Sequence, residues 1–358
     1  MSSAVPLWIE HLRAAAGDED SLGRSLLREE PTRGLGPALA LQAQRYGIEP
    51  RRSWRRELRS SVTNRLLLDA EADDATSTLK QAAVQAVVLK GLAVAPDYAA
   101  LLPHSPDAAL ARPTSDIDLL VPRGQRQSAR TALEQSGWRS LYGGPHAEKY
   151  LDEEGYAWQA ASPSGALLEL HHDLWNSVSP RLSDAALQDC QTTAGLLPRP
   201  NPAVRFVVAA VHGVLEARPR RTLDLLDLEA IRRTATSSLV SDVVTCCRAT
   251  GLQLPVALAT GLAALAFEED AFAEIQRALR SECRGLERSL DARTPDDFSS
   301  RYMTMLRLLS GRGTRLGTRS LWRQLWPHPG IVERDTPDSL PWWRRRLRRQ
   351  LRWTEGRP

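Results

Sequence analysis

Apolar and polar positions change their spacing several times along the chain. Apolar residues three or four positions apart predict a helix over residues 57–68, and residues 29–37 are typical of a loop. From Gln81 the pattern changes to short apolar runs at 86–89, 117–121 and 166–170, with a helical stretch at 124–137. Short runs joined by a helix are typical of strands in a sheet. We therefore predict an α/β core that starts near residue 81.

Two further patterns complete the organisation. Residues 146–161 alternate around aromatic side chains, with Glu-Glu-Gly at the centre, and predict a hairpin. After residue 180 no strand pattern is evident, and helical periodicity covers 201–234, 237–250, 255–279 and 296–309. With no internal repeat, we expect four segments: helical 1–80, an α/β core at 81–178, helical 179–310, and a linker and basic tail at 311–358.

Composition narrows the class of protein. The chain has 358 residues, of which 42% are hydrophobic and 25% charged, so it is long and apolar enough to fold around a core. The N-terminus lacks the features of a secretion signal, and apolar runs such as 255–267 are too short to span a bilayer. We expect a cytoplasmic protein. Its four cysteines lack zinc-site spacing and are expected to be reduced, mostly buried thiols.

Positive charge is concentrated at the C-terminal end. Residues 341–358 hold seven arginines and one glutamate, whereas the net charge of the whole chain is +4, so the remainder is slightly acidic. In residues 341–353, Trp343, Leu347 and Leu351 share one helical face opposite the arginines. This pattern suits contact with a protein partner, an anionic membrane surface or nucleic acid. The alternative is a final helix that packs on the acidic remainder.

Two carboxylates begin the second apolar run. Residues two apart on a strand point to one face, so Asp116 and Asp118 project together while Ile117, Leu119 and Val121 face a core. Two such carboxylates repel each other unless a cation lies between them, and Mg²⁺ bound by carboxylates and substrate phosphates is a common solution. The alternative is a polar strand end at a turn, which is the commoner origin of Asp-x-Asp alone.

The preceding run ends in Lys90 and Gly91. Gly91 permits close approach of a phosphate to the backbone, and Lys90 can meet the phosphate charge. Only three of the 47 basic residues are lysines, which favours a specific role for a retained lysine as a compact ammonium. An ordinary turn with a solvated lysine is the alternative.

The third run supplies Glu169 and His171 on one strand face, opposite Leu168 and Leu170. Glu169 can complete a set of three carboxylates, as a metal ligand or as the base that accepts a proton from an attacking hydroxyl. For His171 and its neighbour His172, a structural or solvated role is the commoner one.

These three motifs together resemble those of a known family. Lys90-Gly91, Arg112 with the run from Ser115 to Val121, and Leu168-Glu169-Leu170-His171 are similar to the signature of the bacterial uncharacterised nucleotidyltransferases, in the DNA polymerase beta superfamily. His212, Arg221 and Asp227 resemble a helical stretch that follows the core in that family, and residues 325–329 resemble a motif near its end. The resemblance covers roughly residues 55–350.

The resemblance implies a nucleotidyltransferase-fold core with a small mixed sheet, flanked by N-terminal helices and a C-terminal helical domain that covers the site. It implies that Asp116, Asp118 and Glu169 bind Mg²⁺ or Mn²⁺ and activate an acceptor. Lys90, Gly91, Arg112 and Ser115 are the candidates for binding the nucleotide. Where this chain has Lys90-Gly91, the wider superfamily usually has Gly-Gly or Gly-Ser.

Two assignments stay open at this point. Arg112 can clamp a phosphate through two hydrogen bonds, which we slightly favour, or pair with Asp116 or Glu169 to hold the site together. His212, Arg221 and Asp227 fit a buried polar cluster that joins helices to the core, and we prefer this to a catalytic role.

The predicted reaction is transfer of a nucleoside monophosphate from a nucleoside triphosphate to a hydroxyl, with two Mg²⁺ ions at Asp116 and Asp118. The acceptor can be a small molecule, a peptide or an RNA end. One alternative is kinase-like transfer of the γ-phosphoryl group on the same fold. Another is a noncatalytic module that senses a nucleotide or binds a partner.

Overall fold

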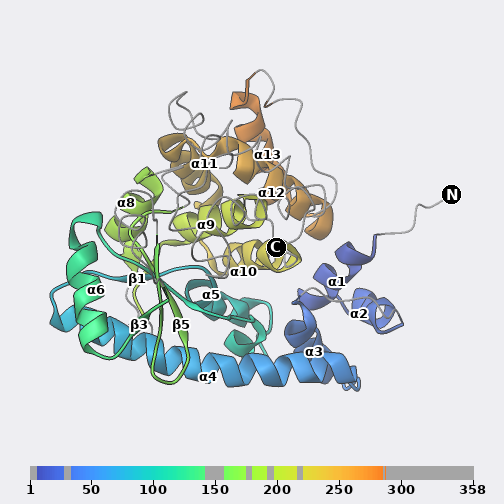
Figure 1. Ribbon diagram of the computed structural model, residues 1–358. Helices are drawn as coiled ribbons and strands as arrows, with labels where there is room; N and C mark the ends of the chain where they lie inside the picture. The colour runs from blue at the N-terminus through green and yellow to red at the C-terminus, as the bar shows by residue number, and fades with distance from the viewer. Residues whose placement is uncertain are drawn as a thin grey trace, which may run out of the picture.

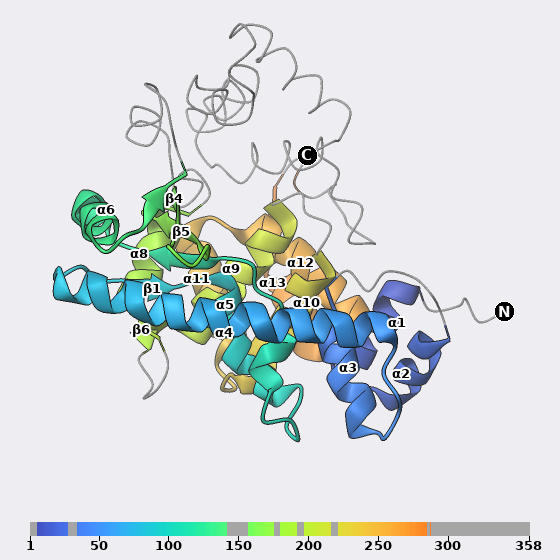
Figure 2. The same cartoon turned by 60° about the horizontal axis from the view of Figure 1, so that its bottom comes forward.

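A long helix and a mixed sheet form the frame of the molecule. The computed structural model describes residues 6–27, 34–141, 157–174, 180–191, 197–215, 221–284 and 287. Four helices precede the sheet: α1 (Leu7–Ala15), α2 (Glu19–Leu26), α3 (Gly36–Arg45) and α4 (Arg52–Gln81). The predicted helix at 57–68 is confirmed as part of α4, whose 30 residues run beneath the sheet (Figures 1 and 2).

The sheet has five strands in the order β1-β2-β5-β4-β3. They are β1 (Val87–Val88), β2 (Ile117–Leu120), β3 (Arg139–Ser140), β4 (Ala157–Ala161) and β5 (Leu167–His171). The central strands β2 and β5 are parallel, and the other pairs are antiparallel. The predicted small mixed sheet is thereby confirmed. The predicted hairpin at 146–161 falls largely on residues outside the described part, and its described end, β4, pairs with β3 and β5.

Alternation along β2 separates two apolar cores. Ile117, Leu119 and Val121 face α4 and α6 (Arg126–Gln135), as the sequence predicts. On α4, Leu68, Ala72, Ala75 and Leu79 are buried, and this spacing places them along one side of a helix. Leu120 points the other way and joins a second core formed by the remaining helices. The helices of the second core cover only part of the sheet face opposite α4. The rest of this face can carry polar side chains.

Short helical elements connect the first strands. They are α5 (Lys90–Val94) and the 3₁₀ helices η1 (Ala95–Ala100), η2 (Ala108–Ala111) and η3 (Arg123–Gln125). Together η3 and α6 confirm the helical stretch predicted at 124–137. Because α5 follows β1 after a single residue and packs on β2, its first residues lie at the polar face of the sheet.

The rest of the described chain is mainly helical, as predicted. Its helices are α8 (Pro180–Gln188), α9 (Pro202–Leu215), α10 (Arg221–Thr234), α11 (Leu239–Thr250), α12 (Gln253–Phe267) and α13 (Asp270–Glu282). Glu268 takes a left-handed conformation and separates the last two. Two short strands, β6 (Cys190–Gln191) and β7 (Arg199–Pro200), pair with each other and correct the expectation of no strands after residue 180. Strands of two residues are too short to give an alternating pattern.

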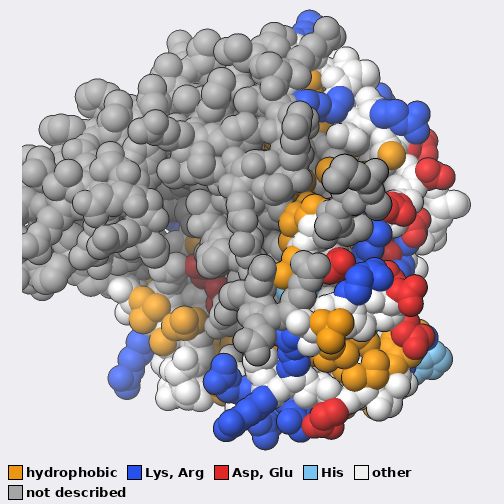
Figure 3. Space-filling model, turned by 90° about the vertical axis from the view of Figure 1, so that its right-hand side faces the viewer, with side chains coloured by type: hydrophobic (Ala, Val, Ile, Leu, Met, Phe, Trp, Pro, Cys, Tyr) orange, Lys and Arg blue, Asp and Glu red, His pale blue; other side chains and the backbone are white. Residues whose placement is uncertain are grey.

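The N-terminal helices share a core with the last helices. Apolar residues from α1 and α3 belong to the same buried cluster as those of α9 to α13, and α1 contacts α10 and α12. In the view of the side that carries α1 to α3, Lys and Arg side chains lie beside Asp and Glu side chains across the described part (Figure 3). The four-segment division stays a prediction.

Other predictions concern the thiols, the membrane and the tail. The four cysteines are free thiols, as expected, with Cys247 and Cys283 buried and Cys190 and Cys246 partly buried. Burial raises the pKa of Cys246 to about 11, so this thiol is protonated at neutral pH.

None of the described helices is long and apolar enough to cross a membrane. The predicted helix at 296–309, the motif at 325–329 and the basic tail lie outside the described residues.

Candidate active site

Strand register brings the predicted acidic residues together on one sheet face. In the parallel pair β2 and β5, Asp118 lies opposite Glu169. Across the next pair, Gln159 on β4 lies opposite Glu169 and donates a hydrogen bond of 2.6 Å from Nε2 to its Oε1. The three side chains thus form a row across adjacent strands. Their position follows from the two-residue alternation that buries Ile117 and Leu119 on the other face.

His171 completes a compact cluster with Asp118 and Glu169. Its Nε2 lies 2.8 Å from Oδ1 of Asp118 and 3.4 Å from Oε2 of Glu169. One ligand atom from each of the three residues can be chosen so that all lie within 4.8 Å of one another. The two-residue period predicts His171 on the same face as Glu169, where a structural or solvated role is the commoner one for a histidine. Its two-residue spacing from Glu169 was the signal that it belongs to this cluster.

Lys90, the first residue of α5, contacts the same two carboxylates. Its Nζ lies 2.7 Å from Oδ1 of Asp118 and 3.6 Å from Oε2 of Glu169. The backbone of Lys90 is left-handed, with φ of +46°, a conformation that costs a residue with a β-carbon roughly 1–2 kcal/mol. The amide of Leu89 donates to the carbonyl oxygen of Asp118, which fixes the turn beside β2. Such a conformation at a candidate site is typical of a functional constraint.

The charges of this group shift the pKa values of its carboxyls. Burial alone would raise the pKa of Asp118, but the Lys90 ammonium and the hydrogen bond from His171 together lower it. The pKa of Glu169 is also lowered, because His171 and Lys90 outweigh burial and the repulsion from Asp118. Both side chains are therefore carboxylates at neutral pH. Burial would lower the pKa of His171, but its hydrogen bonds to Asp118 and Glu169 raise it.

Asp116 lies at the edge of this cluster, and its pKa shifts in the opposite direction to those of Asp118 and Glu169. It is half-buried and accepts a hydrogen bond of 3.0 Å from Oγ of Ser115. Burial and the negative charges of Asp118 and Glu169 raise its pKa. Asp116 lies one residue before β2, close enough for the charges of Asp118 and Glu169 to act on it. A bound cation would relieve this repulsion.

Gly91 is fixed by close packing. A β-carbon at this position would lie 2.7 Å from both Nη1 of Arg112 and Oγ1 of Thr114. Real β-carbons essentially never approach other atoms so closely, so only glycine fits without a shift of its neighbours. The turn formed by Lys90 and Gly91 therefore packs directly against the Arg112 side chain.

Arg112 is held by Asp227 of α10. Its Nε and Nη2 donate to the two carboxylate oxygens of Asp227 at 3.2 and 2.7 Å, and its Nη1 donates to the carbonyl oxygen of Pro113. Tyr98 donates a further hydrogen bond of 2.9 Å to Asp227. The partner of Arg112 is thus Asp227, and not Asp116 or Glu169, the two carboxylates expected from the sequence. The preferred structural role of Asp227, joining a helix to the core, agrees with this geometry.

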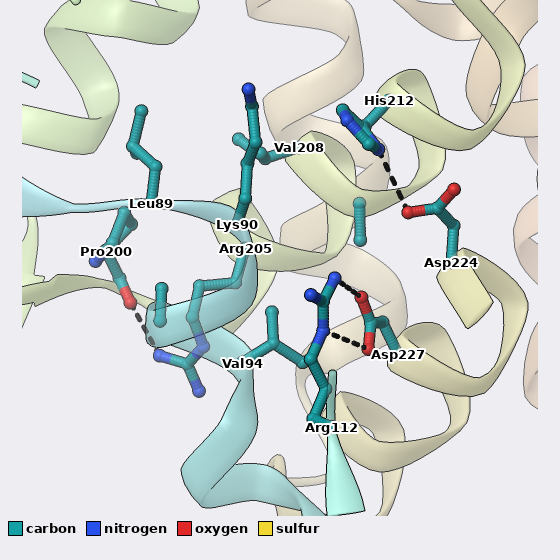
Figure 4. Close-up of a pocket in the computed structure, with 12 residues that line it drawn as sticks. Leu89, Lys90, Val94, Arg112, Pro200, Arg205, Val208, His212, Asp224 and Asp227 are labelled. Atoms are coloured by element: carbon teal, nitrogen blue, oxygen red, sulfur yellow. Dashed lines mark hydrogen bonds and ion pairs between the residues drawn. The ribbon is translucent and has the colours of Figure 1, made fainter. Parts of the chain in front are cut away.

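A narrow pocket lies between Lys90 and the helices α9 and α10. Apolar residues line much of its wall, and Lys90, Arg112, His212 and Asp224 contribute polar groups. The Lys90 side chain extends away from the Arg112–Asp227 pair, and His212 pairs with Asp224 (Figure 4). Nδ1 of His212 lies 3.0 Å from Oδ1 of Asp224. The side chain of Arg221 lies outside the described residues.

The cluster has the chemistry of a divalent cation site. Carboxylate oxygens, here from Asp118 and Glu169 with Asp116 nearby, are the ligands that Mg²⁺ and Mn²⁺ prefer. Lys90 pairs with Asp118 and Glu169, so one ammonium faces two carboxylates. Among the described residues, the donor set that fits such an ion is Asp118, Glu169 and His171, and the predicted ligand Asp116 is not part of this group.

Comparison with known proteins agrees with the motifs. A family model described as "Uncharacterised nucleotidyltransferase" matches residues 31–268, which include Lys90, Asp116, Asp118, Glu169 and Asp227. A search of curated proteins finds no match to the chain.

Proposed function

The chain belongs to the uncharacterised nucleotidyltransferase family, and we propose that it transfers a nucleoside monophosphate from a nucleoside triphosphate to a hydroxyl group. The acceptor that we propose is a small molecule, a peptide or an RNA end. The observation that carries the proposal is the row of Asp118 and Glu169 across two parallel strands, with Asp116 at its edge and Lys90 above it.

In the proposed site, Asp116, Asp118 and Glu169 hold Mg²⁺ or Mn²⁺. When bound, the ion would neutralise charge on the nucleotide phosphates and on the phosphorus under attack. Lys90 provides a further positive charge for the phosphates, and Ser115 holds Asp116 through its hydrogen bond. His171 and Gln159 position the two central carboxylates. His171 thus has a positioning role in this proposal.

The proposed reaction exchanges one bond to the α-phosphorus for another. The acceptor oxygen forms a bond to the α-phosphorus, and the bond from that phosphorus to the bridging oxygen breaks. Pyrophosphate leaves with the electron pair. Glu169 orients the acceptor hydroxyl and accepts its proton directly or through a water molecule. Because its pKa is lowered, Glu169 is a weak base, which favours orientation as its larger contribution.

In this proposal, Arg112 and Gly91 have different roles in nucleotide binding. All three nitrogens of the Arg112 guanidinium donate hydrogen bonds within the protein, two of them to Asp227. We therefore propose that Arg112 holds the Lys90–Gly91 turn in position, and that contact with the phosphates falls to Lys90 and the backbone of Gly91.

The test is label transfer from each α-labelled nucleoside triphosphate, with Mg²⁺ or Mn²⁺, in cell extract. The wild type should label an acceptor, and the double variant Asp116→Ala/Asp118→Ala should not. Asp74→Asn removes an exposed carboxylate from α4 and serves as the control, with labelling equal to that of the wild type. Equal labelling by the double variant would disprove the catalytic assignment.

The position of the label separates this reaction from the alternatives. Transfer of label only from the γ position would identify phosphoryl transfer, as in a kinase. Nucleotide binding without turnover, unchanged in Asp118→Asn, would identify a noncatalytic module.

A further inference from the structure

Lys90 lies where a cation would be expected in a carboxylate site. Its Nζ is within 2.7 Å of Asp118 and 3.6 Å of Glu169, and only 11% of its side chain is exposed. A distance of 2.7 Å is typical of a strong hydrogen bond between an ammonium and a carboxylate. The ammonium therefore meets the same two carboxylates that are proposed to bind metal.

The backbone holds the ammonium in this position. Lys90 begins α5 with a left-handed φ of +46°, and the amide of the preceding Leu89 is bonded to the carbonyl oxygen of Asp118. Gly91 packs against Arg112, which Asp227 fixes in turn. Contacts of its two neighbours, Leu89 and Gly91, therefore fix the turn that positions Lys90.

The charges of the cluster leave room for one divalent ion. Asp116, Asp118 and Glu169 carry three negative charges when ionised, and Lys90 reduces the total to two. One Mg²⁺ or Mn²⁺ then neutralises the cluster, whereas a second ion would make it positive before the nucleotide phosphates are counted.

Lysine is also the suitable side chain for this position. An ammonium is a compact point charge, whereas a guanidinium is planar and wider. The chain uses lysine at only three of its 47 basic positions, and Lys90 is one of them.

We propose that the ammonium of Lys90 takes one of the two cation positions of this site, so that the protein binds a single divalent ion with its nucleotide. This inference rests on the proposed nucleotidyltransferase function and replaces the pair of Mg²⁺ ions expected from the sequence. Lys90 would stabilise the phosphates permanently, and the site would need to recruit only one ion.

The test counts bound ions. Purified full-length protein is dialysed against Mn²⁺ with a saturating α,β-methylene analogue of ATP, and with those of CTP, GTP and UTP in parallel. Protein-bound Mn²⁺ is measured by electron paramagnetic resonance. We expect one Mn²⁺ per chain for the wild type and two for Lys90→Met and Lys90→Gly, because loss of the ammonium frees a cation position. The glycine variant accommodates the left-handed backbone and so protects the test against misfolding.

A lysine outside the site serves as the control. Lys80→Met removes an exposed lysine at the end of α4 and should bind one Mn²⁺, as the wild type does. Two ions on the wild type, or one ion on both Lys90→Met and Lys90→Gly, would overturn the inference alone. If Mn²⁺ binds the wild type and Asp116→Ala/Asp118→Ala equally with all four analogues, the proposed function fails, and the inference fails with it.

Discussion

Two groups of buried charges meet at the Lys90–Gly91 turn, and they differ in how their charges are matched. In the first, the guanidinium of Arg112 faces the carboxylate of Asp227 with two hydrogen bonds, and Tyr98 adds a third. One positive charge meets one negative charge. In the second, Asp118 and Glu169 both pair with Lys90, and Asp116 lies within reach of their charges. Carboxylates outnumber the lysine there.

The difference separates a structural link from a binding site. A matched pair needs nothing from solution, and its two partners come from segments 115 residues apart, so it joins α10 to the core. A cluster in which carboxylates outnumber cations is costly without a bound cation, because like charges repel each other in a partly buried site. Substitutions should therefore affect stability in one group and ligand binding in the other.

The largest expected effect on stability comes from breaking the matched pair. Asp227→Asn leaves the buried Arg112 without its counter-charge, and removal of one partner from such a pair typically costs about 3–5 kcal/mol. Urea unfolding should show this loss of free energy. Asp184→Asn, an exposed position on α8, is the control and should change it by less than about 0.5 kcal/mol. A loss below about 1 kcal/mol for Asp227→Asn would contradict the structural assignment.

The next effect tests the contact between the two groups. In Gly91→Ala, the new β-carbon would lie 2.7 Å from Nη1 of Arg112, and relief of the overlap should cost about 1–3 kcal/mol. Movement of the turn should also weaken nucleotide binding through Lys90. Gly23→Ala on α2 is the matched control, because no atom lies within 4 Å of its new β-carbon. It should leave stability unchanged or raise it by up to about 1 kcal/mol.

Alternation of apolar and polar residues predicted much of the acidic site. The apolar positions Ile117 and Leu119 fixed which face Asp118 occupies, and Leu168 and Leu170 did the same for Glu169. Each assignment depends on residues within one strand, where the two-residue period is a local property of the backbone. The helices were predictable for the same reason, because their periodicity is also local.

The rest depends on contacts between distant segments. The pairing of Arg112 with Asp227 joins residues far apart in sequence, and no local pattern specifies it. His171 gains its place from the neighbouring strand that carries Asp118, so its own sequence context did not distinguish it from a structural histidine. The left-handed backbone of Lys90 follows from packing around the next residue, Gly91. Residue type alone would have favoured an ordinary conformation.

A smaller effect is expected from the third member of the matched group. Tyr98→Phe removes one hydrogen bond to Asp227, while both hydrogen bonds from Arg112 remain. The free energy of unfolding should fall by about 1 kcal/mol, the usual contribution of one hydrogen bond. Tyr46→Phe, which removes a 2.9 Å hydrogen bond to the carbonyl oxygen of Gly17 away from the site, gives a comparison. A loss above about 3 kcal/mol for Tyr98→Phe would mean that Tyr98, rather than Arg112, is the main partner of Asp227.

The smallest effect on stability should come from the unmatched group. The substitutions above lower the free energy of unfolding, whereas this one should not. Asp116→Asn removes one of three mutually repelling carboxylates, so without divalent ions the free energy of unfolding should stay the same or rise by less than about 1 kcal/mol. Urea unfolding with a chelator present measures this, and label transfer by the same variant should be lost. A loss of stability above about 1 kcal/mol would show that Asp116 holds the fold together as Asp227 does. The contrast between equal Asp→Asn changes at 116 and 227 therefore tests whether unmatched charge marks the site.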